Sequence, residues 1–130
     1  MLIFGHRFIP SENFYHISDI DAILKTPPHS TLFLQWNENN LDIITYMRDN
    51  NLSFGLEVTT ITELLYASSL GAKYIFVPQE LAKTAQSIAE NYLFDAKIVL
   101  FIEDESLLEE MALLGIDGVV FSNAIVKINS

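Results

Sequence analysis

The sequence predicts an α/β fold whose sheet is all-parallel and built from successive βα units. Short β-branched or aromatic runs alternate along the chain with stretches of helical period. Runs such as 98–102 (Ile-Val-Leu-Phe-Ile) are apolar at every position, which requires burial on both faces. A sheet of this kind is parallel and covered by helices, so an antiparallel sandwich is excluded.

Seven strands are expected, each a short run bounded by polar or turn residues. In chain order they span 2–4, 14–17, 31–36, 54–58, 74–78, 98–102 and 118–121. The helices between them carry start signals, because Thr60 with Glu63 and Ser106 with Glu109 have the spacing of capping boxes. The pair 27–28 (Pro-Pro) closes the first helix, since proline cannot continue it.

Two glycines mark helix ends and reveal a faint internal repeat. Gly71 and Gly115 stand where a helix needs a left-handed terminal residue. They lie 44 residues apart, and the same offset matches Leu56 with Leu100. Stacked βα units of similar length produce such a repeat.

The length bounds the architecture. A complete eight-unit barrel needs ~200–250 residues, so 130 residues supply about half to two thirds of one. We therefore expect a single domain over 1–130 that is either a partial, half TIM-barrel-like sheet or a flavodoxin-like three-layer sandwich. Barrel-like motifs favour the first, and the ease of covering both sheet faces within one chain favours the second.

Composition excludes several classes of function. Seventeen acids against seven bases give a net charge of −10, which disfavours nucleic acid and anionic membranes as partners. The chain has no cysteine, so disulfides, thiolate metal clusters and a cysteine nucleophile are excluded. The five glycines spell neither a dinucleotide fingerprint nor a Walker loop, and no cofactor is expected. The apolar start is too short for a signal peptide, so a cytoplasmic location is expected.

The segment 116–123 (Ile-Asp-Gly-Val-Val-Phe-Ser-Asn) resembles the last strand and turn of phosphate-binding (βα) barrels, such as the tryptophan synthase α chain. In that family, backbone N–H groups of the turn hold a substrate phosphate. The resemblance implies that Ser122 and Asn123 contact a small phosphorylated ligand. Ligands of parallel sheets bind beyond the carboxyl ends of the strands, and Glu57 at such an end is a further ligand-binding candidate.

The segment 5–7 (Gly-His-Arg), followed by 10–13 (Pro-Ser-Glu-Asn), resembles the first strand end of glycerophosphodiester phosphodiesterases. The resemblance implies that His6 transfers protons as the catalytic residue, that Arg7 clamps phosphate and that Glu12 ligates a divalent metal. The family's glutamate-x-aspartate metal pair and its second histidine have no counterpart here.

Two functions of different classes follow. The first is a non-catalytic domain on a truncated barrel-like scaffold that binds a small ligand or a protein partner and self-associates as a homo-oligomer. The self-association is expected because an open half-barrel leaves one sheet face bare. The alternative is a metal-dependent phosphodiesterase-like or phosphate-ester-binding enzyme. As an exposed strand-end residue, His6 should be replaceable by alanine with little change in stability.

Overall fold

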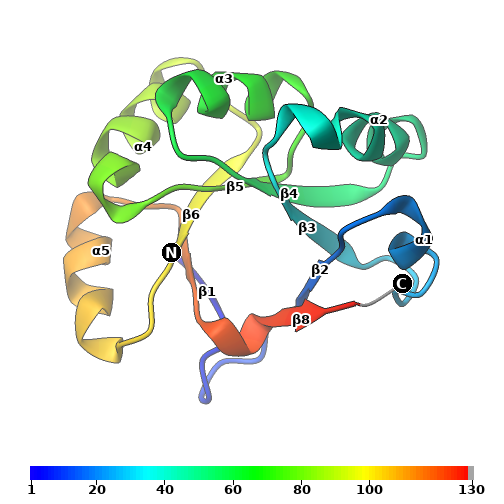
Figure 1. Cartoon of the computed structure of the whole chain (residues 1–130). Helices are drawn as coiled ribbons and strands as arrows, with labels where there is room; N and C mark the ends of the chain where they lie inside the picture. Colours follow the sequence, from blue (N-terminus) through cyan, green and yellow to red (C-terminus); the bar gives the residue numbers. More distant parts are fainter. Residues whose placement is uncertain (129–130) are drawn as a thin grey trace.

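The computed structural model describes residues 1–128, in which eight parallel strands alternate with helices and curl into a half-barrel (Figure 1). The strands are β1 (Leu2–Phe4), β2 (Phe14–His16), β3 (Thr31–Gln35), β4 (Ser53–Glu57), β5 (Tyr74–Phe76), β6 (Lys97–Phe101), β7 (Gly118–Val120) and β8 (Ile125–Lys127). The α-helices are α1 (Ile20–Ile23), α2 (Leu41–Asp49), α3 (Ile61–Ser69), α4 (Ala82–Asn91) and α5 (Leu108–Leu114). Short 3₁₀ turns are η1 (Glu38–Asn40), η2 (Gln79–Leu81), η3 (Glu105–Leu107) and η4 (Ser122–Ala124).

The strand order decides between the two expected architectures. The order is β1-β7-β6-β5-β4-β3-β2-β8, so β2 to β7 are neighbours in chain order. In a flavodoxin-like sheet the order in which successive strands are added reverses at a switch point, so such an unbroken run of neighbours does not occur. The half-barrel is therefore confirmed, and the sandwich alternative is wrong.

The eighth strand was not expected from the sequence. After β7 the chain makes the η4 turn, and β8 then pairs with β2 at the other edge of the sheet. Gly5, directly after β1, allows this turn to pass closely, because a Cβ at Gly5 would lie 2.8 Å from the backbone nitrogen of Ala124. Its φ of +81° also suits glycine. The segment from β7 to β8 thus connects the two edge regions of the sheet (Figure 1).

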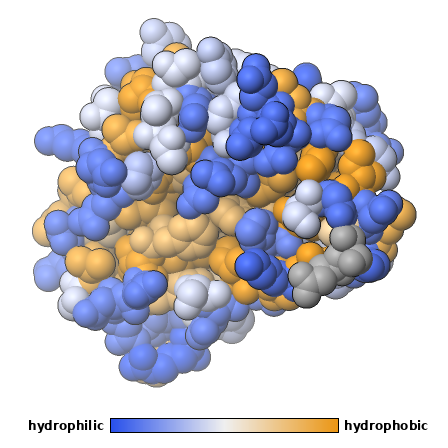
Figure 2. Space-filling view, viewed as in Figure 1, coloured by the Kyte–Doolittle hydropathy of each residue, from blue (hydrophilic) through white to orange (hydrophobic). Residues whose placement is uncertain are grey.

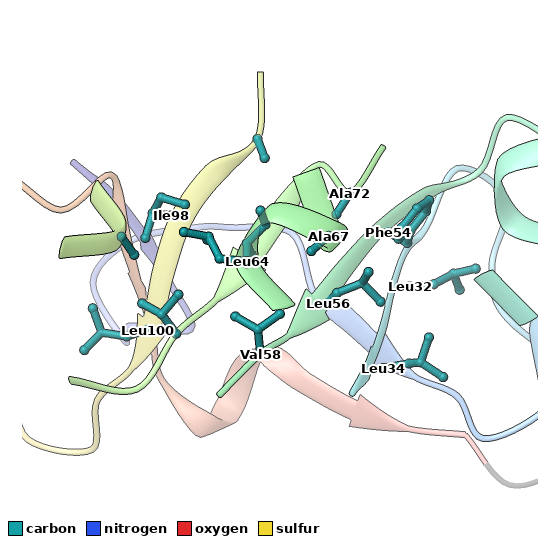
Figure 3. Close-up of a cluster of buried hydrophobic side chains, with 14 of the residues drawn as sticks. Leu32, Leu34, Phe54, Leu56, Val58, Leu64, Ala67, Ala72, Ile98 and Leu100 are labelled. Atoms are coloured by element: carbon teal, nitrogen blue, oxygen red, sulfur yellow. The ribbon is translucent and has the colours of Figure 1, made fainter. Parts of the chain in front are cut away.

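The outer face of the sheet packs against the helices. Leu64 and Ala67 of α3 lie over outward-facing strand residues such as Leu56 and Ile98, all of which are fully buried (Figure 3). Thr60 caps α3, since its hydroxyl accepts a hydrogen bond from the Glu63 N–H at 3.1 Å. This amphipathic packing fixes each helix on the outside of the curl.

The inner face is filled by the sheet's own side chains. Phe4, Phe14, Phe33, Tyr74 and Phe76 form an inner cluster and are each at most 5% exposed. Their neighbouring ring centroids lie 4.7–5.6 Å apart in edge-to-face arrangements. Figure 2 shows apolar atoms across the recessed middle of the face drawn there. The inner face is not bare, so this reason for self-association does not hold.

One expected helix start is wrong. Asp104, rather than Ser106, accepts at the start of the last helical segment, taking a hydrogen bond from the Ser106 N–H at 2.9 Å. The segment opens with the η3 turn, and α5 itself begins only at Leu108. Within residues 1–128, none of the helices has the length and apolar content to cross a membrane.

Candidate functional site

A pocket of about 290 Å³ lies where the loop after β1 meets the loop after β6 and the η4 turn. It gathers four of the residues singled out from the sequence, from two ends of the chain. Its lining comprises Gly5, His6, Arg7, Glu103, Glu105, Phe121, Ser122 and Asn123. The two sequence resemblances therefore meet at the carboxyl ends of β1 and β7, which pair with each other.

His6 is held on every side. Its side chain is 7% exposed, and its ring packs edge-on against Phe8 and Phe121 with centroids 5.0 and 5.3 Å away. The Phe8 N–H donates to Nδ1 at 3.1 Å, so Nδ1 is the acceptor nitrogen and Nε2 carries the proton. Nε2 donates to the Glu105 carboxylate at 2.7 Å. Both ring nitrogens are thus engaged within the chain.

Arg7 is paired with the same carboxylate. Its guanidinium lies against Glu105 as a two-pronged ion pair, with the outer Nη2–Oε2 separation at 3.5 Å, and it also stacks over the Phe8 ring at 4.4 Å. The Arg7 side chain is 64% exposed, so the pair is accessible to water and to ligands. Glu105 therefore occupies the position that an anionic ligand of Arg7 would take.

The remaining lining sets the charge of the pocket. Ser122 and Asn123 are exposed and offer neutral hydrogen-bonding groups. Glu103 is exposed and adds a second acid beside Glu105. With Glu105 neutralising Arg7, the pocket carries no net positive charge, which disfavours a dianion.

Glu12 is not part of this pocket. It lies just before β2, at the amino end of the sheet, where it accepts a hydrogen bond from the Tyr74 hydroxyl at 3.0 Å. Burial, this hydrogen bond and the nearby Glu12 charge raise the pKa of Tyr74 to about 12. The carboxyl ends of the strands, where His6 lies, are at the opposite end of a parallel sheet. The fold thus separates Glu12 from His6 and Arg7, the other two residues of the phosphodiesterase-like set.

The described residues do not supply a metal-binding set. Across positions 1–128 no three His, Asp or Glu side chains gather closely enough to hold a metal ion. In this part of the chain, Glu105 is the carboxylate that contacts His6 and Arg7, and their donors already neutralise it. A divalent cation needs several oxygen ligands, so these residues do not fit one.

Glu57 lies apart from the pocket, on the inner face at the carboxyl end of β4. Strand alternation places it on the same side as Gly55, whose position faces the Phe76 ring. The side chain is half-buried, and desolvation raises the pKa of Glu57.

Two polar residues outside the predicted site set, His16 and Gln35, lie at the carboxyl ends of β2 and β3. His16 packs against Phe33 with ring centroids 5.2 Å apart, and Gln35 is the register partner of Glu57. Burial first and the charge of Lys127 second lower the pKa of His16. Side chains two residues apart on a strand share a face, so assigning Phe33 to the inner face would have placed Gln35 there too, beside Glu57.

Comparison of the chain with protein-family models gives no match, and comparison with curated proteins gives none either. The fold and the side-chain geometry are therefore the basis for a functional conclusion. They define an α/β half-barrel with a small pocket at the carboxyl ends of β1, β6 and β7.

Proposed function

We propose that the chain is a non-catalytic binding domain whose small ligand occupies the pocket between His6, Arg7, Ser122 and Asn123. The observation that carries this proposal is the state of His6. A general acid or base must exchange a proton with a substrate, whereas both nitrogens of His6 are engaged and the ring is nearly buried. The pocket beside His6 has a volume of about 290 Å³, close to the lower limit of the volumes of small-molecule sites.

The ligand of this pocket is small and offers hydrogen-bonding groups to Ser122 and Asn123. Resemblance to phosphate-binding barrels adds a phosphate or carboxylate as one part of the ligand. Such a group binds Arg7 by exchanging with the Glu105 carboxylate, which is its intramolecular competitor. The cost of that exchange limits the affinity for simple anions.

A thermal-shift screen with phosphorylated metabolites, carboxylates and divalent metals tests the proposal. A true ligand at a hundred times its dissociation constant adds ~2.7 kcal/mol to the free energy of unfolding. We expect Arg7→Ala and Asn123→Ala to remove that gain, and Lys83→Ala, a charge change on α4, to retain it. Stabilisation that survives both pocket variants would place the ligand elsewhere and contradict the proposal.

A second candidate is an enzyme acting on phosphate esters. The convergence of His6, Arg7, Ser122 and Asn123 in one pocket favours it. The separation of Glu12 and the engagement of His6 count against it, so it ranks below the binding domain.

A further inference from the structure

The inner face of the half-barrel ends in a second group of polar side chains. At the carboxyl ends of β2, β3 and β4 stand His16, Gln35 and Glu57, next to the rings of Phe33 and Phe76. These residues share the inner side of the sheet, because strand side chains alternate and the rings belong to the inner cluster. An apolar floor thus meets a polar edge at this end.

Glu57 is the unusual member of the group. Among residues 1–128 no ion pair or side-chain hydrogen bond engages its carboxylate, although the side chain is half-buried. Two other acids near this end are paired, Glu105 with Arg7 and Glu63 with the Thr59 N–H. In the described part of the chain Glu80 and Glu103 are unpaired, but they are exposed to water rather than half-buried. An unpaired carboxylate over an apolar floor costs free energy, so a group that pairs with it from solution gains affinity there.

The floor beside Glu57 presents aromatic surface. Phe76 is the register partner of Glu57 on β5, and Phe101 lies against Phe76 with ring centroids 4.9 Å apart and planes tilted by 30°. Phe101 is 38% exposed, whereas the other rings of the floor are buried. Aromatic faces attract cations through their quadrupole.

The surrounding charge favours a positive ligand beside Glu57, at the carboxyl end of β4. Lys127 and His16 stand on β8 and β2, and β3 separates them from Glu57. The chain as a whole carries a net charge of −10, which raises the local concentration of cations.

We propose that this end of the half-barrel binds an organic cation, with its ammonium or guanidinium group between the Glu57 carboxylate and the exposed ring of Phe101, which packs on the buried Phe76. This site lies on the inner face at the ends of β4 to β6 and is distinct from the His6 pocket, which is lined by the loops after β1 and β6 and by the η4 turn. Its existence does not depend on what the His6 pocket binds.

The experiment titrates the protein with choline, benzylammonium and ethylguanidinium and follows the NMR signals of Phe101 and Glu57. The neutral control ligand is 3,3-dimethyl-1-butanol, which has the shape of choline without its charge. The variants are Glu57→Gln, Phe101→Leu and the matched control Glu80→Gln. Glu80 is an exposed acid of η2 at the same end of the sheet.

We expect at least one of the three cations to bind saturably, with the neutral analogue about tenfold weaker or more where choline binds. Glu57→Gln should weaken the cation about tenfold and Phe101→Leu severalfold, while Glu80→Gln leaves affinity unchanged. No saturable shift with any cation, equal binding of choline and its neutral analogue, or equal losses in Glu57→Gln and Glu80→Gln would each overturn the proposal. Glu57→Gln keeps the side-chain volume, and its amide spectrum reports whether it is folded.

Discussion

At the scale of single residues, the burial of His6 changes its expected role from an exposed strand-end residue to a packed structural one. The sequence suggested an exposed strand-end histidine that could be replaced at little cost. In the structure its ring is packed between Phe8 and Phe121 and joins the first loop to Glu105. The expected exposure is wrong, because packing of the loops, which no local sequence pattern encodes, encloses the ring.

His6→Ala should therefore lower the free energy of unfolding by about 1–3 kcal/mol, since it removes packing and leaves the Phe8 N–H without its partner. Urea denaturation followed by circular dichroism measures the change. His29→Asn, in the loop before β3, is the control for loss of an exposed histidine, because asparagine tolerates the φ of 63° at this position. A loss of less than ~0.5 kcal/mol in His6→Ala would show that the ring does no structural work.

Glu57 gives a pH-dependent prediction. Desolvation raises the pKa of Glu57 in the folded state, so the folded chain binds more protons than the unfolded chain at pH values just above 4.5. The wild type therefore loses stability as pH rises through that window. Glu57→Gln should match the wild type near pH 3.5 and exceed it slightly at pH 7, by ~0.5 kcal/mol or less because water screens the half-exposed carboxyl.

Urea titrations of both proteins at the two pH values measure this difference. Glu80→Gln is again the matched control and should show no such dependence. A Glu57→Gln protein that is less stable than the wild type at pH 7 would mean that the carboxylate has a stabilising partner, contrary to this account.

At the scale of elements, the helices end in one shared way. After α2, α3, α4 and α5 stands a residue with positive φ, and the N–H of the next residue returns to the last helical turn. These residues are Asn51, Gly71, Leu93 and Gly115. Their positions are spaced by 20, 22 and 22 residues, which is the length of one βα unit. The 44-residue offset between Gly71 and Gly115 therefore spans two such units.

The sequence revealed two of these four ends because glycine is the usual residue in the left-handed region. Asparagine also adopts the left-handed region but is common elsewhere, so Asn51 is a weaker signal. Leucine rarely adopts this region, so Leu93, at φ 54°, gives no signal in the sequence. Strands and most caps were equally readable, since they depend on local patterns. The η4 turn and β8 were not, because β8 is only three residues long and is defined by pairing with β2.

Leu93→Gly should raise the free energy of unfolding by about 0.5–1 kcal/mol, because glycine removes the left-handed strain and the leucine is 85% exposed. Thermal unfolding measures the gain. Gly71→Ala is the reverse control, since a Cβ there meets nothing within 4 Å and only the φ of +91° opposes it. A loss of stability in Leu93→Gly would show that the exposed side chain makes a stabilising contact.

At the scale of the whole molecule, self-association remains a prediction with a changed motive. The inner sheet face is covered, but apolar side chains stay exposed on α3 and beyond the end of α4. Leu65, Tyr66, Tyr92 and Leu93 are 43%, 50%, 74% and 85% exposed. Leu65 and Tyr92 line a hollow of about 520 Å³ with Ile88 and Phe94.

Light scattering at high micromolar concentration should give a mass above the 14.7 kDa of one chain. The mass should rise with salt, because screening weakens the repulsion between two chains of charge −10. Leu65→Glu should reduce it, and Leu24→Glu, an equally drastic change after α1, should not. A mass of one chain at every concentration and salt would contradict the prediction.

The central claim is that the pocket at the ends of β1 and β7 holds His6 and Arg7 in a structural contact rather than in a catalytic set. Hydrolysis of a chromogenic phosphodiester with magnesium, calcium or manganese tests it most directly. We predict no turnover by the purified protein above that of a parallel Arg7→Ala preparation. Metal-dependent turnover that persists through purification and disappears in His6→Ala or Glu12→Ala would contradict the account, because losing one member of a catalytic set costs orders of magnitude in rate.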